Sequence, residues 1–136
     1  MARGPSLAER FGAAARRLPG VSEHPSQFAP VRAWWIDGRE FAHLREGTLS
    51  VRLTRREIAV TRHRLVAEPR VTLNRSEWVD VRLRVATDLP LAREIFRAAA
   101  EANRRRPGET KRLTPDDRSL ARRRRLHGAS TEELED

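Results

Sequence analysis

The chain has 136 residues, a length that suits one domain, and its 28 basic and 19 acidic residues give a formal charge of +9. It contains no cysteine, which excludes disulfides, thiol catalysis and cysteine-ligated metal sites. Residues 1–20 lack the apolar run of a signal peptide and no window has the length of a membrane span, so we expect a cytoplasmic protein without a membrane partner.

The N-terminal part of the sequence predicts a helix followed by a three-stranded meander. Ser6 and Glu9 form a capping box, and apolar residues recur at helical spacing as far as Leu18. Residues 21–30 follow neither a helical nor a strand period, so we expect an ordered connector there. Alternating patterns and two turn dipeptides, Asp37-Gly38 and Glu46-Gly47, then predict strands over residues 31–36, 39–44 and 48–53.

The next stretch predicts a short helix and two more strands. Thr54 and Glu57 make a second capping box, which indicates a helix that begins directly after it. A short strand over residues 71–73 and a longer one over residues 78–85 follow. The longer strand alternates cleanly, so its valine and leucine side chains should face the core.

The last predicted element is an amphipathic helix. Thr87 or Asp88 is its expected cap, Pro90 lies in its first turn, and an apolar stripe extends to Ala102. This helix should pack across the sheet. The sequence therefore predicts an α+β fold with the N-terminal helix first and an antiparallel sheet of about five strands, with the helices packed on one face.

The composition changes after Asn103. Residues 104–125 hold ten basic and three acidic residues but few large apolar ones. Such a segment cannot bury enough apolar surface to offset the entropy of ordering, so we expect a mobile, basic tail. We therefore predict a domain over residues 1–103 and an arginine-rich tail over residues 104–136, in which residues 114–126 could form a helix on a partner.

Several short motifs between Gly20 and Asn103 resemble a known family. They are Phe41-Ala42-His43, the run Gly47–Leu53, Ala67-Glu68-Pro69 and the run Ser76–Leu83. The stretch resembles the luciferase-like small domain family and, more distantly, the MmcQ/YjbR family. The resemblance implies a frataxin-like α+β arrangement, and it implies DNA binding by analogy with the MmcQ/YjbR fold; it implies no luciferin-binding or oxygen-activating residue.

The basic charge favours a polyanionic partner, and this is our leading hypothesis. Trp34 and Trp35 are adjacent in a strand and therefore point to opposite faces, so one should be in the core. We place Trp35 on the outer face beside three arginines, where bases could stack and phosphates could pair. The predicted binding residues are Trp35, Arg52, Arg82, Arg84, Arg122, Arg123, Arg124 and Arg125. The protein would then be a non-enzymatic binding domain that engages nucleic acid or another polyanion.

A second hypothesis comes from a different class. His43 lies in a motif of the resemblance, and we expect it to share a strand face with Phe41. A pocket near His43, with an aromatic wall from Trp34 or Trp35, would make this a small-molecule-binding or enzymatic domain. The plainer alternatives are a partly buried histidine bonded to the backbone or to a carboxylate, and arginines that simply solvate the sheet and tail.

The sequence contains no recognisable catalytic constellation. The four histidines are not at metal-ligand spacing, and Ser50 and Ser76 have neither a glycine-framed turn nor an identifiable base. We read Glu40 and Asp80 as solvated surface carboxylates, and no phosphate-binding glycine motif is present. We therefore predict no catalytic residues, no metal and no cofactor, and we lean against an enzyme.

Overall fold

A computed structural model describes residues 4–74 and 77–104. In chain order the elements are α1 (Leu7–Ala15), β1 (Val21–Pro25), β2 (Arg32–Ile36), β3 (Arg39–Arg45), β4 (Thr48–Arg52), α2 (Arg55–Ala67), β5 (Val71–Leu73), β6 (Trp78–Arg82), a 3-10 turn (Ala86–Asp88) and α3 (Leu89–Asn103). The helix predicted after residue 114 and nearly all of the predicted tail lie outside the described residues.

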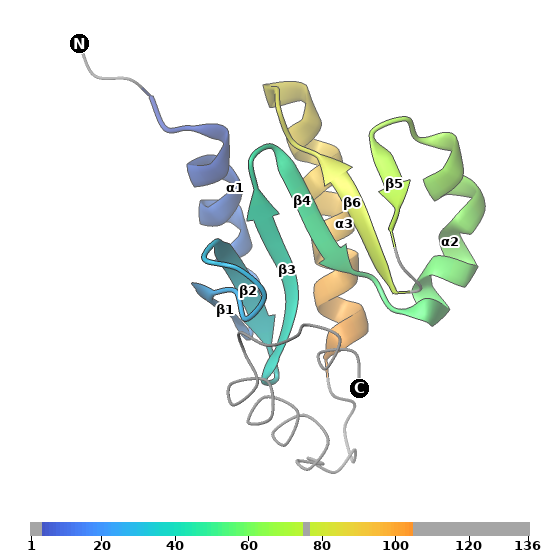
Figure 1. The fold of residues 1–136 in the computed structure, drawn as a ribbon, viewed down its shortest axis with the longest axis horizontal. Coiled ribbons are helices and arrows are strands. Elements are labelled where there is room, and N and C mark those ends of the chain that lie inside the picture. The colour runs from blue at the N-terminus through green and yellow to red at the C-terminus, as the bar shows by residue number, and fades with distance from the viewer. Residues whose placement is uncertain (1–3, 75–76, 105–136) are drawn as a thin grey trace. The chain divides into compact units, whose positions relative to one another are not determined.

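The sheet confirms the predicted fold class. Its six strands run in the order β1-β2-β3-β4-β6-β5, and every neighbouring pair is antiparallel. The central strands β2, β3 and β4 form the predicted meander. The turn between β2 and β3 has φ of 50° at Asp37 and 81° at Gly38, the left-handed backbone that a tight hairpin of this kind needs. Figure 1 shows α1 and α3 behind the sheet and α2 beside β5.

Strand β1 is the element that the sequence did not predict, because residues 21–30 were expected to be a connector. Val21 is partly buried, but the next residue on its side of the strand is charged. Glu23 forms ion pairs with Arg16 at 3.0 Å and with Arg32 at 3.3 Å. An edge strand that faces arginines lacks the apolar alternation by which strands are recognised, and its terminal Pro25 is tolerated because it lies at a sheet edge.

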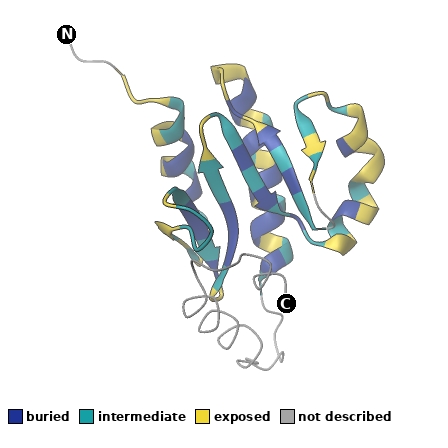
Figure 2. Ribbon diagram, viewed as in Figure 1, coloured by how far each residue is buried: buried dark blue, intermediate teal, exposed yellow. Residues whose placement is uncertain are grey.

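The core lies between the sheet and the helices and is built around four aromatic rings. Phe96 of α3 lies 5.0 Å from Phe11, 5.6 Å from Trp34 and 4.9 Å from Phe41, measured between ring centroids. The first two of these contacts are edge-to-face, a favourable geometry for aromatic pairs. Apolar side chains of all three helices join this single cluster, so the helices pack on one face as predicted (Figure 2).

A β-bulge in β3 decides which side chains reach the opposite face of the sheet. Ala42 pairs with Trp34, whereas the next pair along is Trp35 with Glu40, so Phe41 is an extra residue. Phe41 and Ala42 are both fully buried. Since the bulge reverses the alternation, Glu40 and His43 lie on the same outer face although they are three residues apart. The prediction that His43 shares a face with Phe41 is therefore wrong.

The start of α2 stores backbone strain. Thr54 has φ of 76° and ψ of 152°, a region that is essentially restricted to glycine. Its backbone N–H and that of Leu53 both donate to the carbonyl of Glu77, at 3.3 and 2.8 Å. Its Oγ1 also accepts the N–H of Glu57 at 3.3 Å, which is one of the two bonds of the predicted capping box. These bonds hold the strained residue between β4 and α2.

Two substitutions at Thr54 separate the cap from the strain. Thr54→Ala keeps the strain and loses the cap, so it should lower the free energy of unfolding by about 1 kcal/mol. Thr54→Gly also loses the cap but relieves the strain, so it should be more stable than the alanine variant by about 1 kcal/mol. Urea unfolding of both variants measures the difference. Equal stability of the two variants would show that Thr54 is not strained.

Candidate functional site

A buried carboxylate organises the outer face of the sheet. Glu40 is only 4% exposed. It accepts hydrogen bonds from Ser26 Oγ at 2.7 Å, from the backbone N–H of Gln27 at 2.8 Å and from His43 Nδ1 at 3.1 Å. Because a buried charge is costly unless it is bonded, these donors are what makes its burial possible. The prediction that Glu40 is a solvated surface carboxylate is wrong.

The bond to Glu40 fixes the orientation and the tautomer of His43. A carboxylate only accepts hydrogen bonds, so the proton of a neutral imidazole lies on Nδ1 and the lone pair on Nε2. Nε2 has no hydrogen-bond partner among residues 4–74 and 77–104, and 20% of the side chain is exposed. The outer face therefore presents a fixed hydrogen-bond acceptor to solvent.

Two aromatic rings lie against this imidazole. The centroid of the His43 ring is 5.5 Å from that of Trp78 and 5.9 Å from that of Phe28, and the Phe28 and Trp78 rings meet edge to face at 6.1 Å. His43 and Trp78 lie on β3 and β6, on either side of β4. Ser50 of β4 pairs with His43 across the sheet. We attribute the contact between the two rings to the small size of this serine.

The segment after β1 supplies three residues of the site. Ser26 and Gln27 bond Glu40, and Phe28 reaches the two rings of the sheet face. The segment is itself tied down, because the N–H of Ser26 donates to the carbonyl of Val31 at 2.9 Å and that of Phe28 donates to Ser26 Oγ at 3.0 Å. We call residues 26–31 the strap. The strap bonds Glu40, while part of the His43 side chain stays exposed.

Ser50 is bonded away from the histidine. Its Oγ donates to Asp80 Oδ1 at 2.7 Å, and Asn74 donates to both carboxylate oxygens of Asp80 at 3.4 and 3.2 Å. Asp80 is half-buried rather than a free surface carboxylate. Because the Ser50 hydroxyl is bonded to this carboxylate and not to His43, the histidine does not activate it as a nucleophile. In the described ranges no group of three or more histidine and acidic side chains could hold a metal ion.

The two tryptophans take the opposite faces that their adjacency predicts. Trp34 is fully buried in the core, so it is not a wall of a pocket near His43; Phe28 and Trp78 take that place. Trp35 pairs with Glu40 on the outer face. Arg52 and Arg82 are not beside it, because β3 lies between β2 and the strands β4 and β6 that carry them, and Arg84 follows the end of β6.

Two of the three predicted sheet arginines already have side-chain partners. Arg52 forms an ion pair with Glu77 at 2.8 Å and donates to Asn103 Oδ1 at 3.1 Å. Arg82 donates to Asp88 at 3.3 Å. Arg84 is exposed. The four predicted tail residues, Arg122, Arg123, Arg124 and Arg125, lie outside the described residues.

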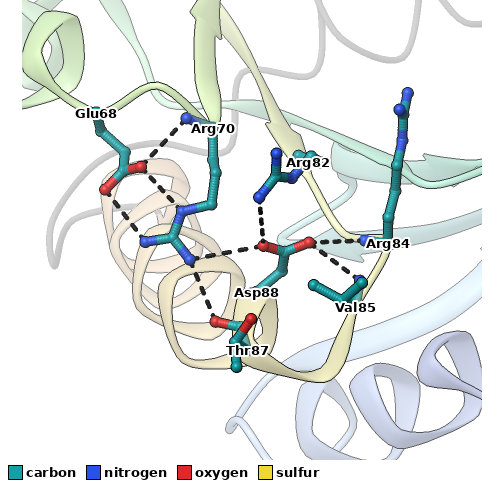
Figure 3. Close-up of polar contacts among 7 residues, drawn as sticks. All are labelled: Glu68, Arg70, Arg82, Arg84, Val85, Thr87 and Asp88. Atoms are coloured by element: carbon teal, nitrogen blue, oxygen red, sulfur yellow. Dashed lines mark hydrogen bonds and ion pairs between the residues drawn. The ribbon is translucent and has the colours of Figure 1, made fainter.

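Figure 3 shows the bonds that surround Asp88, at the junction of β6 and α3. This fully buried carboxylate accepts the backbone N–H of Arg84 at 2.9 Å, that of Val85 at 3.1 Å and a guanidinium N–H of Arg82 at 3.3 Å. The bond from the Arg84 N–H is the main cause that holds the pKa of Asp88 far below its ordinary value, with help from Arg82 and Val85. The carboxylate anchors this junction and is structural.

A groove of about 300 Å³ lies elsewhere, on the helix side of the sheet. Leu65 of α2 and Ile95 of α3 line its apolar part, and the ion pair between Arg64 and Glu94, at 2.8 Å, lies on its wall. It has no lining residue in common with the His43 site. No helix in the described ranges is long and apolar enough to span a bilayer; cytoplasmic localisation stays a prediction.

The fold and the outer-face site define an α+β domain with a carboxylate-held histidine. Residues 38–99 match the family model of the luciferase domain, which confirms the resemblance to the luciferase-like small domain family over this stretch. The matched stretch includes Glu40, His43 and Trp78 but begins after the strap. The resemblance to the MmcQ/YjbR family stays a prediction. No curated protein and no solved structure matches the chain.

Three members of the site, Ser26, Phe28 and Trp78, were not identified from the sequence. The strap has no periodicity that would place Ser26 and Phe28 over β3. Trp78 was assigned to a strand but not to a face, because its contact with His43 crosses an intervening strand. One available signal was the apolar pair Phe41-Ala42, which interrupts the alternation of β3 and is typical of a bulge.

Asp88 makes stability depend on pH in a defined direction. Its pKa is lowered in the folded state, so the stabilisation is fully present above the ordinary aspartate value, near 4, and is lost as pH falls below it. Asp88→Asn removes the charge and should lower the free energy of unfolding at pH 7 by about 2 kcal/mol.

Urea unfolding of the wild type and of Asp88→Asn from pH 7 down to about pH 2 measures this effect. The difference between the two proteins should shrink with falling pH. The matched control is Asp80→Asn. It removes the charge of a half-buried carboxylate that, within the described residues, accepts hydrogen bonds from side chains and not from the backbone. A difference that stays constant down to the acid end would contradict the assignment.

Proposed function

We propose that this luciferase-like domain binds a small planar molecule on the outer face of the sheet, beside His43. The observation that carries the proposal is the bond between Glu40 and His43 Nδ1, which leaves the lone pair of Nε2 free in a side chain that is 20% exposed. Burial of Glu40 and its bonds to the strap fix the imidazole before any ligand arrives. A ligand that donates a hydrogen bond to Nε2 would therefore lose little entropy in ordering the site.

The aromatic neighbours favour a flat ligand. The rings of Phe28 and Trp78 lie at 5.5 to 5.9 Å from the imidazole and offer apolar surface next to its polar edge. Binding sites of this kind combine mostly apolar walls with a few placed polar groups. A ring that carries one O–H or N–H donor would use both features, since its face contacts the aromatic side chains and its donor meets Nε2.

The pair of Glu40 and His43 can also accept a proton from an acidic ligand. A proton that moves to Nε2 creates an imidazolium, and the Glu40 carboxylate at 3.1 Å offsets its charge. A complete reaction would need more than this acceptor, and the only hydroxyl paired with His43 across the sheet, that of Ser50, donates to Asp80. The proposed role is therefore binding, with His43 as a proton acceptor.

Binding of a polyanion to the sheet face has less support. The guanidinium groups of Arg52 and Arg82 each have an acidic partner within 3.3 Å, and the same face carries Glu40 and Asp80. A phosphate backbone that bound there would have to displace these pairs and approach the carboxylates. Polyanion binding by the tail arginines stays a prediction.

Two matched probes test the proposal: phenol, which has an O–H donor, and anisole, which has the same ring without the donor. We expect phenol to shift the NMR signals of the His43 ring and the Trp78 indole. It should bind roughly five to ten times more tightly than anisole, the ratio that one hydrogen bond of about 1 kcal/mol gives. Chemical-shift titrations of the full chain measure both affinities.

Variants test whether the preference for phenol over anisole depends on His43. His43→Ala should remove the preference for phenol, and Glu40→Gln should reduce it because the tautomer is no longer fixed. His63→Ala, at an exposed position on α2, is the matched control and should change nothing. Equal binding of the two probes by the wild type, or a preference that survives His43→Ala, would refute the proposed site.

A further inference from the structure

Helix α2 exposes a cluster of cationic side chains. Its thirteen residues include four arginines and one glutamate, and only Ile58 and Leu65 are buried. Figure 2 shows most of the helix as exposed. Arg64 pairs with Glu94 of α3. The other three, Arg55, Arg56 and Arg62, are exposed and make no hydrogen bond or ion pair through their side chains with residues 4–74 or 77–104; we call them the α2 patch.

The fold makes no use of these three charges. Other arginines in the described ranges form ion pairs with carboxylates: Arg16, Arg32, Arg52, Arg64, Arg70, Arg82 and Arg104. Arg55 and Arg56, by contrast, occupy the first turn of α2. A positive charge there opposes the helix dipole and lowers helix stability by a few tenths of a kcal/mol or more. Their presence is therefore not explained by stability.

The geometry of the patch suits a phosphate backbone. Arg55 and Arg62 are seven residues apart, about two helical turns, and so lie in one row roughly 10 Å long. Duplex nucleic acid carries about one negative charge per 1.7 Å of its axis, so such a row faces several phosphates. Arginine pairs with phosphate through two parallel hydrogen bonds and stays charged at any physiological pH.

The distribution of apolar side chains argues against a lipid surface. Helices that lie in a membrane interface have a continuous apolar face opposite their basic face. On α2 the two large exposed apolar residues, Val60 and Val66, are 65% and 63% exposed and lie about 120° apart around the helix. Arg56 lies on the arc between them, so no apolar stripe is available for insertion.

We infer that α2 is a nucleic-acid-binding surface that contacts the phosphate backbone, independent of base sequence, through Arg55, Arg56 and Arg62. This surface lies on a different element from the His43 site, so the inference goes beyond the proposed function and does not depend on it. The partner is a DNA or RNA duplex, because both present the same phosphate charge to the row of arginines.

Fluorescence anisotropy of the full chain with labelled 20-base-pair DNA and RNA duplexes, from roughly 50 to 200 mM salt, tests the inference. The variant Arg55→Gln/Arg56→Gln/Arg62→Gln should bind at least about tenfold more weakly. The slope of log K against log salt should become shallower by about 2 to 3, since each lost phosphate contact contributes about 0.9.

The matched control is Arg10→Gln/Arg17→Gln/Arg97→Gln, which removes the same charge from exposed positions on α1, on the turn after it and on α3. It should weaken binding less than threefold and leave the salt slope nearly unchanged. Thermal melting checks folding, and the α2 variant should melt at or above the wild-type temperature because two charges that oppose the dipole are gone.

Three results would overturn the inference. The first is equal weakening by the two triple variants, which would make the effect one of net charge. The second is no duplex binding by the wild type in this salt range. The third is an unchanged duplex affinity in the α2 variant together with lost binding to phosphatidylserine vesicles, which would assign α2 to a membrane surface. If the α2 triple variant melts at a lower temperature than the wild type, Arg55→Gln/Arg62→Gln replaces it. This double variant should show about two thirds of the change in the slope of log K against log salt.

Discussion

The burial of the Glu40 charge is the constraint on which the outer face depends. A carboxylate that is 4% exposed must be met by donors, and the donors come from two places in the chain: Ser26 and Gln27 of the strap and His43 of the same strand. The loop is therefore fixed to the sheet and the imidazole to the carboxylate by one set of bonds. Loss of the Glu40 charge would release both the strap and the imidazole of His43.

The bulge at Phe41 connects this site to the core. By adding a residue to β3 it buries Phe41 and Ala42 side by side and returns Glu40 and His43 to the outer face. The aromatic cluster around Phe96 therefore fixes the backbone from which the site projects. The two buried carboxylates have different roles. Asp88 stabilises the junction of β6 and α3, whereas Glu40 orients the partly exposed side chain of His43.

Local patterns predicted most of the fold but little of the site. Capping boxes, turn dipeptides and period-2 runs depend on neighbouring residues, so α1, α2, α3 and the β2–β4 meander could be predicted. Strand β1 was missed because Glu23 forms ion pairs with Arg16 and Arg32 instead of giving its place in the strand to an apolar residue. Glu40 was misassigned because its burial depends on Ser26, fourteen residues away, and on a bulge that changes its face. These are tertiary effects that a single sequence does not encode locally.

The proposed binding site depends most directly on the tautomer of His43. Nitrogen-15 NMR of the imidazole, at a pH where the ring is neutral, distinguishes a protonated Nδ1 from a protonated Nε2. We expect Nδ1 to carry the proton in the wild type, and we expect Glu40→Gln to shift the population toward the Nε2–H form. A neutral His43 with its proton on Nε2 in the wild type would refute the proposed site, because the acceptor that the proposed ligand needs would not exist.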